Sequence, residues 1–245
     1  MSQTEAIKTP ILTYKHPEHE NQVDLVGMMH IAEPVYYQTV QEFVDTRVAD
    51  GAVVHYERSK IPTAQELSAA PPAVRRKVER VLGANREIYG MLGEIDGLVH
   101  QSKGLTYRDG WKNHDSTLLE TVAGMNRLTV DGLCARVKLA KLAHRIMGPE
   151  EMQKILLEQL VDATSKEPKP AGFIETITSI GHKKHVILGR NAVALAAFDA
   201  ELRNNPAQDL LLLWGARHLQ GMNKDVKNRG FVQTHEQYLT AIQPR

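Results

Sequence analysis

The stretch VDLVGMMHIAEP, residues 23–34, runs from an apolar segment into a glycine and places His30 three positions later. The stretch DLLLLWGARHLQGM, residues 209–222, repeats the pattern with Gly215 and His218. Glycine lets a strand turn sharply at its end, and in parallel sheets ligands bind beyond the carboxyl ends of the strands. The two G-x-x-H motifs therefore predict an α/β fold in which one histidine from each half of the sheet reaches a shared site.

The residues around the first motif extend this prediction. Residues 10–27 alternate like a β-hairpin around a polar turn that contains Pro17 and Asn21. Pro34 opens a helical pattern that Gly51 stops, and AVVHYE, residues 52–57, follows as a short strand. A strand, helix, strand order of this kind predicts parallel pairing.

The last third of the chain returns to α/β alternation, whereas the middle is helical. After the breaker SKEPKPAG, the sequence predicts strands, helices and a final strand. Between about residues 61 and 169 long helical patterns dominate, and residues 98–115 look extended. We expect residues 1–60 and 170–245 to form one α/β core domain with a mixed, largely parallel sheet, and residues 61–169 to form a helical insertion or cap. The predicted elements of the last third are strands at 184–189 and 209–215, helices at 190–205 and 221–230, and a strand at 231–239.

The composition excludes several classes of protein. Lysine and arginine number 30 against 29 acidic residues, so no net field favours general binding to nucleic acid or an anionic membrane. No apolar run reaches the roughly 18 residues needed to span a bilayer, and the N-terminus does not read as a signal peptide. A cytoplasmic location is the default expectation. Cys134, the only cysteine, falls in a helical pattern where it can act as a small apolar residue.

A carboxylate joins the two histidines at a predicted strand end. On residues 52–57 the period of two puts His55 and Glu57 on one face, and Glu57 emerges where the strand ends. A carboxylate beside imidazoles fits a metal ligand or a general base. The alternative for Glu57 is a salt bridge with Arg58 or Arg190, and we interpret His55 as a core residue.

Two further segments offer candidate ligand-binding groups. Arg190 opens a predicted helix, where an arginine adds a planar donor fork suited to a carboxylate or an oxyanion. The segment YRDGWKNHD, residues 107–115, supplies Tyr107 and Asp115 as candidate cofactor-binding residues of a pocket. Asp115 has an alternative interpretation as the N-cap of the helix that follows. Likewise, each G-x-x-H histidine has an alternative interpretation as a cap of the helix after its turn.

Four motifs in this order resemble the TraB/PrgY/GumN family, which is related to the Tiki proteases and more distantly to erythromycin-esterase and ChaN-like proteins. The first and last thirds of the chain match in order and spacing, and the middle matches loosely. Met28 and Met29 depart from the small residues usual before the first histidine. The motifs are GMMH at 27–30, a strand ending in Glu57 and Arg58, LGRNAVALAAFDAEL at 188–202 and WGARHLQGM at 214–222.

The resemblance implies roles for particular residues. His30, Glu57 and His218 match proposed metal or catalytic positions of the family, and Arg190 matches its arginine before the final helix. Tiki-like relatives imply a divalent-metal-dependent peptidase that uses manganese or cobalt in preference to zinc. ChaN-like relatives imply haem binding, and PrgY-like relatives imply inhibition of a peptide pheromone.

Three functions follow as hypotheses. In the first, a metal held by His30, Glu57 and His218 activates water against a peptide or ester carbonyl, Arg190 stabilises the oxyanion, and Asp115 supplies a second acid. In the second, the same pocket binds a peptide, haem or another small ligand without turnover. In the third, the helical middle segment is an interaction surface.

Overall fold

The computed structural model describes residues 6–19, 21–93, 97–148 and 187–243. The chain divides into two compact units, of which the first comprises Met1–Arg58, Gly97–Asp115 and Asn191–Arg245, and the second comprises Ser59–Asp96 and Ser116–Arg190. The segment 97–115, which the sequence placed in the helical insertion, belongs to the first unit because it pairs with strands there.

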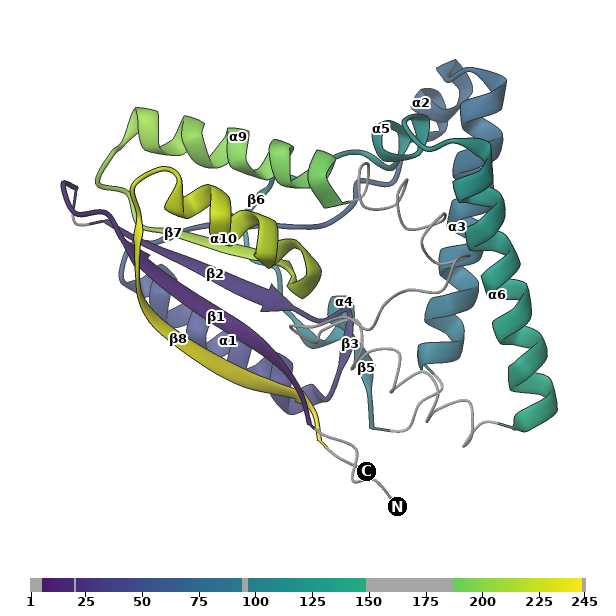
Figure 1. Cartoon of the computed structure of the whole chain (residues 1–245), viewed down its shortest axis with the longest axis horizontal. Helices are drawn as coiled ribbons and strands as arrows, with labels where there is room; N and C mark the ends of the chain where they lie inside the picture. Colours follow the sequence, from purple (N-terminus) through teal and green to yellow (C-terminus); the bar gives the residue numbers. More distant parts are fainter. Residues whose placement is uncertain (1–5, 20, 94–96, 149–186, 244–245) are drawn as a thin grey trace. The chain divides into compact units, whose positions relative to one another are not determined.

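The first unit is built on a six-stranded mixed sheet with the order β6-β4-β7-β2-β1-β8 (Figure 1). Strand β7 pairs in parallel with β2 and β4, and β4 pairs in parallel with β6. Strand β1 pairs antiparallel with β2 and β8. The α/β class expected from the sequence is confirmed. The strands are β1 (Ile7–Lys15), β2 (Gln22–Met28), β4 (Val53–Tyr56), β6 (Lys112–Asn113), β7 (Leu210–Gly215) and β8 (Val232–Ile242).

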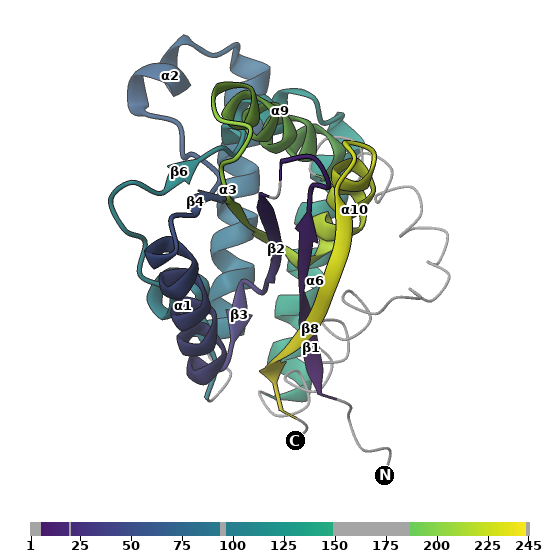
Figure 2. The same cartoon turned by 90° about the vertical axis from the view of Figure 1, so that its left-hand side faces the viewer.

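Helices cover both faces of this sheet, so its central strand is apolar along its whole length. Helix α1 (Pro34–Ala49) lies on one face, and helices α9 (Gly189–Asn204) and α10 (Leu219–Lys227) lie on the other (Figure 2). Every residue of β7 is buried, as its LLLLWG sequence requires in a strand that is packed on both faces. Trp214 shares one core cluster with Phe198 of α9 and Met222 of α10.

Short elements surround the carboxyl ends of the parallel strands. Strand β3 (Ile31–Ala32) pairs with β5 (Val99–His100), and helix α4 (Gln101–Gly104) follows β5 directly. The extended conformation expected over residues 98–115 is therefore interrupted by one helical turn. A 3-10 helix, η2 (Ala216–His218), leads from β7 into α10.

The strand expected at residues 184–189 is wrong where the structure describes it. Ile187 and Leu188 form a turn of π-helix that runs into α9, while 184–186 lie outside the described residues. The sequence that follows is rich in alanine and leucine, which are strong helix formers, and the helix takes in the apolar residues before Gly189.

The second unit is helical in its described part, as the sequence predicted. Its helices bury a separate apolar cluster that includes Val78 and Val81 of α3, Val122 of α5 and Val130 of α6. None of the described helices of the chain is both long enough and apolar enough to cross a membrane. The helices of this unit are α2 (Ala64–Ala69), α3 (Pro72–Gly93), α5 (Leu118–Ala123) and α6 (Arg127–Met147).

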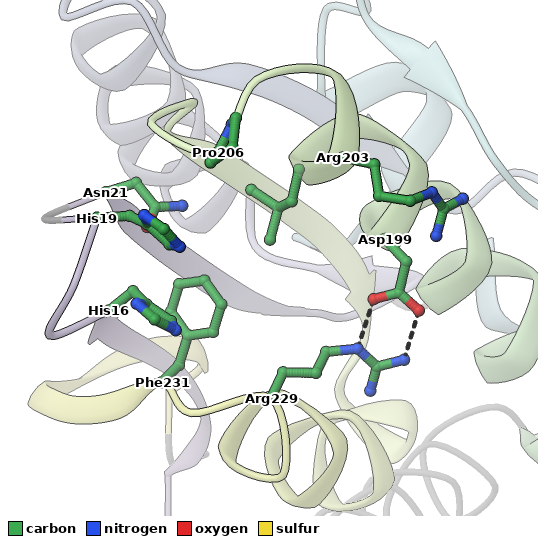
Figure 3. A pocket seen from close by; sticks show the side chains of 9 residues that line it. His16, His19, Asn21, Asp199, Arg203, Pro206, Arg229 and Phe231 are labelled. Carbon is green, nitrogen blue, oxygen red and sulfur yellow. Dashed lines mark hydrogen bonds and ion pairs between the residues drawn. The ribbon is translucent and has the colours of Figure 1, made fainter.

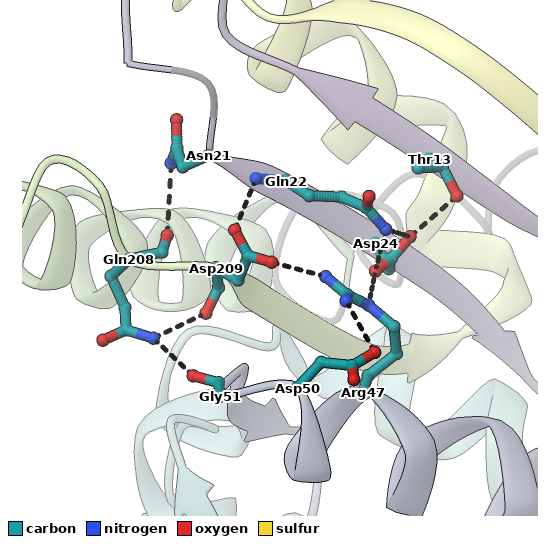
Figure 4. A network of polar contacts seen from close by, with 9 residues as sticks. All are labelled: Thr13, Asn21, Gln22, Asp24, Arg47, Asp50, Gly51, Gln208 and Asp209. Atoms are coloured by element: carbon teal, nitrogen blue, oxygen red, sulfur yellow. Dashed lines mark hydrogen bonds and ion pairs between the residues drawn. The ribbon is translucent and has the colours of Figure 1, made fainter.

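An ion network around the buried Asp24 fixes α1 to the amino ends of β2 and β7 (Figure 4). The Arg47 guanidinium donates to Asp24 at 2.8 Å and to Asp209 at 2.8 Å. Asp24 is fully buried and also accepts from Thr13 and Gln22. Because the three elements that share these charges come from distant parts of the sequence, the network sets how α1 meets the sheet.

His55 of β4 gives the fold a dependence on pH. Its side chain is fully buried, its Nε2 lies 3.4 Å from Glu201 Oε2, and its ring centroid is 4.4 Å from that of His114. Burial, followed by the positive charge of His114, lowers the pKa of His55 to about 4. The midstrand histidine is a core residue, as the sequence suggested.

We therefore expect acid to destabilise the protein through His55. The unfolded chain binds a proton near pH 6.5 and the folded chain only near pH 4, so stability present above pH 6.5 is lost as the pH falls between these values. The loss should be about 3 kcal/mol. Urea unfolding at several pH values measures it, and His55→Leu should flatten the curve in this window. An equally steep curve in the variant would contradict this assignment.

Candidate functional site

The parallel strands bring four of the predicted site residues to one edge of the sheet. Met28 at the end of β2 pairs with Gly215 at the end of β7, and Tyr56 at the end of β4 pairs with Leu213. Glu57 follows β4 by one residue, His218 ends η2 just after β7, and His30 follows β2 by two residues. Asp115 follows β6 in the same way. These strand ends are where an α/β sheet places its ligands.

Glu57 and His218 form a buried pair. The Nε2 atom of His218 lies 3.6 Å from Oε1 of Glu57, and the two side chains are each 4% exposed. The backbone N–H of Gly215 donates to Glu57 Oε2 at 2.5 Å. A Cβ atom at position 215 would lie 3.2 Å from that oxygen, so the glycine leaves room for the carboxylate. Gly215, the glycine of the second G-x-x-H motif, therefore makes room for the Glu57 carboxylate in addition to its place in the turn.

Asn191 of α9 determines which nitrogen of His218 carries a proton. Its Nδ2 donates to the carbonyl oxygen of His218 at 3.2 Å, which fixes the orientation of the amide. Its Oδ1 therefore faces Nδ1 of His218 at 2.5 Å, and an amide oxygen can only accept. Nδ1 must be the protonated nitrogen, and Nε2 is the atom that faces Glu57.

Close packing of α9 and α10 holds this amide in position. Gly221 of α10 approaches Asn191 so closely that a Cβ atom there would lie 2.7 Å from Nδ2. Any larger residue at 221 would displace the amide from His218. Asn191 and Gly221 are thus neighbours of the candidate site that no sequence pattern predicted, although both lie inside the motifs at 188–202 and 214–222.

Neither G-x-x-H histidine caps the helix after its turn. His218 occupies the N-cap position of α10, but its side chain makes no capping hydrogen bond. The N-cap of α1 is Glu33, three residues after His30. The alternative interpretation of both histidines as helix caps is therefore wrong.

His30 has a different environment from His218. Its residue is exposed, and its Nδ1 lies 3.1 Å from Oε1 of Gln101 in α4. Gln101 donates through Nε2 to the hydroxyl of Tyr107 at 3.0 Å, so its oxygen is the atom that faces His30. In this arrangement Nδ1 of His30 is the donor. Both histidines are therefore oriented through Nδ1 by a carboxamide oxygen, Asn191 for one and Gln101 for the other.

The three predicted metal ligands do not form one coordination group in this structure. Within the described part of the chain, the nitrogen and oxygen atoms of His30, Glu57 and His218 do not all lie within 4.8 Å of one another. The structure brings Glu57 and His218 together, while His30 follows β2 at the same edge of the sheet. The two G-x-x-H turns also differ, because β2 continues past Gly27 whereas β7 ends at Gly215.

Tyr107 is linked to His30 through Gln101, which contacts both side chains. Its ring packs 4.9 Å from that of Tyr56 and 5.9 Å from that of Trp111, and the Arg58 guanidinium lies over it at 5.2 Å. Burial raises the pKa of the Tyr107 hydroxyl, the hydrogen bond with Gln101 and the positive charge of Arg58 oppose the shift, and Tyr56 and Glu57 add to it by smaller amounts. The hydroxyl therefore stays protonated and lies within the electrostatic reach of the Glu57 carboxylate.

Asp115 and Arg190 are both buried. Asp115 is not the cap of the following helix, because Thr117 caps α5 in a capping box with Glu120. Instead, the N–H of Asp115 donates to the side chain of Asn113 at 3.1 Å. Arg190 lies in the first turn of α9, where the two units of the chain meet in sequence. Its role toward an oxyanion stays a prediction.

The pair of Glu57 and His218 fits a divalent metal ion. Two ligands about 2.1 Å from a tetrahedral ion lie about 3.4 Å apart, close to the distance between the two side chains. Histidines that bind metals also donate their other N–H to a fixed acceptor, which is the arrangement that Asn191 provides. The residues present thus supply two ligands and the orientation of the imidazole.

The chain matches no protein-family model and no curated protein sequence. The resemblance to the TraB/PrgY/GumN family therefore stays a prediction from the four motifs.

Proposed function

We propose that the protein is a divalent-metal-dependent hydrolase of peptide or ester bonds, with its site at the carboxyl ends of β4, β7 and β2. The observation that carries this proposal is the pairing of His218 Nε2 with Glu57 Oε1 at 3.6 Å, while Asn191 fixes the proton on Nδ1. A buried histidine held in one tautomer beside a carboxylate is more specific than either motif alone.

The roles of the other residues follow from their positions. His218 and Glu57 would hold the ion, and His30 would be its third ligand or the histidine nearest to the substrate. When bound, a divalent ion would polarise the substrate carbonyl and increase the acidity of water. Both carboxylate oxygens of Glu57 already have neighbours, so we assign proton transfer to Asp115 after β6. The role of Arg190 toward the carbonyl oxygen stays a prediction from the sequence.

Metal content and hydrolysis, measured together, test the proposal. Wild type, His218→Ala, His30→Ala and the control His235→Ala would be purified, loaded with Mn²⁺ or Co²⁺ and assayed on an unstructured peptide and an aryl ester. His235 is an exposed histidine of β8 and a matched substitution. We expect His218→Ala to lose one bound ion and the metal-stimulated hydrolysis, and His235→Ala to keep both.

The possible results separate the candidate functions. Equal metal content in wild type and His218→Ala would overturn the site. Metal uptake that depends on His218, without hydrolysis of either substrate, would favour a binding protein for a peptide, haem or another small ligand. A loss with His30→Ala as large as with His218→Ala would make His30 a ligand, and a smaller loss would place it on the substrate side. Because His218 is buried, circular dichroism of each variant checks that it folds.

A further inference from the structure

The turn between β1 and β2 carries a second group of metal-binding side chains. Its sequence is HPEH, residues 16–19, and the ligand atoms of His16, Glu18 and His19 all lie within 4.8 Å of one another. Glu18 and His19 are exposed, and His16 is half-buried. None of these side chains belongs to the site proposed above. The two sites lie at opposite ends of β2. Its seven residues extend about 20 Å from this turn to the end that leads to His30.

Contacts with the fold hold the imidazoles of this turn in place. The His16 and His19 rings stack with centroids 4.6 Å apart and planes 21° apart. The His16 ring also meets the edge of the buried Phe231 ring at 5.1 Å, and its backbone N–H donates to the carbonyl oxygen of Asn21 at 3.2 Å. A turn packed in this way positions its side chains before any ligand binds.

Asn21 adds an unpartnered buried acceptor beside the histidines. Its Nδ2 donates to the carbonyl oxygen of Gln208 at 3.2 Å, which fixes the orientation of the amide. Its Oδ1 then has no hydrogen-bond partner, although the residue is only 2% exposed. Buried acceptors nearly always have a partner, so this atom indicates a missing one.

The same residues line a pocket of about 330 Å³ (Figure 3). His16, His19 and Asn21 form one wall of this pocket, and Arg229 stands on another. Arg229 is neutralised by Asp199, to which it donates at 2.6 and 2.8 Å. The charge of Arg229 is therefore offset by that of Asp199, and the pocket, which Arg203 also lines, has space for an ion with its water.

We propose that the hairpin turn binds a divalent transition-metal ion of the zinc class through His16, Glu18 and His19. Two imidazoles and one carboxylate are a known set of protein ligands for zinc, and imidazole selects zinc, copper and nickel over magnesium and calcium. The N–H of Glu18 donates to Nδ1 of His16 at 3.2 Å and occupies the lone pair of that nitrogen, so coordination of an ion through Nδ1 would replace this hydrogen bond. Asn21 Oδ1 accepts from the water that completes the shell of the ion.

Zinc titration of the full chain by isothermal calorimetry tests this site. The variants are His19→Ala and Glu18→Gln, with His235→Ala as a matched exposed histidine and His218→Ala as the variant of the other proposed site. Both His19 and Glu18 are exposed, so these changes remove ligands without removing core packing. Mg²⁺ replaces Zn²⁺ in a parallel titration.

We expect His19→Ala and Glu18→Gln to bind zinc at the turn at least about tenfold more weakly than wild type. His218→Ala and His235→Ala should keep this binding event, and Mg²⁺ should not produce it. Unchanged zinc affinity and stoichiometry in both His19→Ala and Glu18→Gln would overturn the proposal. Because His218→Ala is titrated alongside, failure of the turn site and failure of the strand-end site give different results.

Discussion

Glu57→Gln is expected to reduce metal-stimulated hydrolysis by at least about 100-fold while the protein stays folded. Glutamine has nearly the shape of glutamate, and its oxygen can still accept from the Gly215 N–H. Its amide nitrogen would then face His218 Nε2 in place of Glu57 Oε1. An N–H donor at this position forms a hydrogen bond with Nε2 and occupies its lone pair. The negative charge of the carboxylate is lost as well, so neither the imidazole nitrogen nor the carboxylate remains to bind the metal.

The measurement is the initial rate of peptide hydrolysis at saturating Mn²⁺ or Co²⁺, together with the melting temperature. Glu42→Gln is the control, because it removes an exposed carboxylate of α1 by the same substitution, outside both proposed metal sites. Its hydrolysis rate should equal that of wild type. A Glu57→Gln protein that hydrolyses the peptide at the wild-type rate would exclude Glu57 from the reaction.

Strong local patterns made much of the fold predictable. The alternating hairpin, the fully apolar β7 and the Pro34 helix start each follow from residues within one short window, and the structure has all three. The strand expected at 184–189 failed in its described part, because an apolar window of this length fits a helix as well as a strand. Only the helix that follows decides between them.

The sequence predicted which strand ends carry the site residues, but not which side chains orient the two histidines. Parallel pairing places Glu57 and His218 at one edge, as the strand, helix, strand order led us to expect. The amides that orient the histidines could not be found in this way, because Asn191 and Gln101 are ordinary polar residues of helices. Their roles depend on how α9 meets α10 and how α4 meets the end of β2, and no local pattern encodes either contact.

Arg47→Met is expected to destabilise the protein by about 3–5 kcal/mol. The change keeps much of the apolar stem of the side chain and removes only the guanidinium, which bridges Asp24 and Asp209. Asp24 is fully buried, and its hydrogen bonds from Thr13 and Gln22 do not replace the lost positive charge. Leaving a buried carboxylate without its cation is one of the few effects of a single substitution that lower the free energy of unfolding this much.

Urea unfolding of three variants separates this effect from the loss of an ordinary ion pair. Arg108→Met breaks the pair of Arg108 with Asp45, which is exposed to solvent, and should cost less than about 1 kcal/mol. Adding Asp24→Asn to Arg47→Met should recover part of the lost stability, because the neutral amide no longer needs a cation. Equal losses for Arg47→Met and Arg108→Met would show that Asp24 does not depend on Arg47. Recovery in the double variant would instead locate the cost at the buried charge, because neutralising Asp24 restores no contact that Arg47 made.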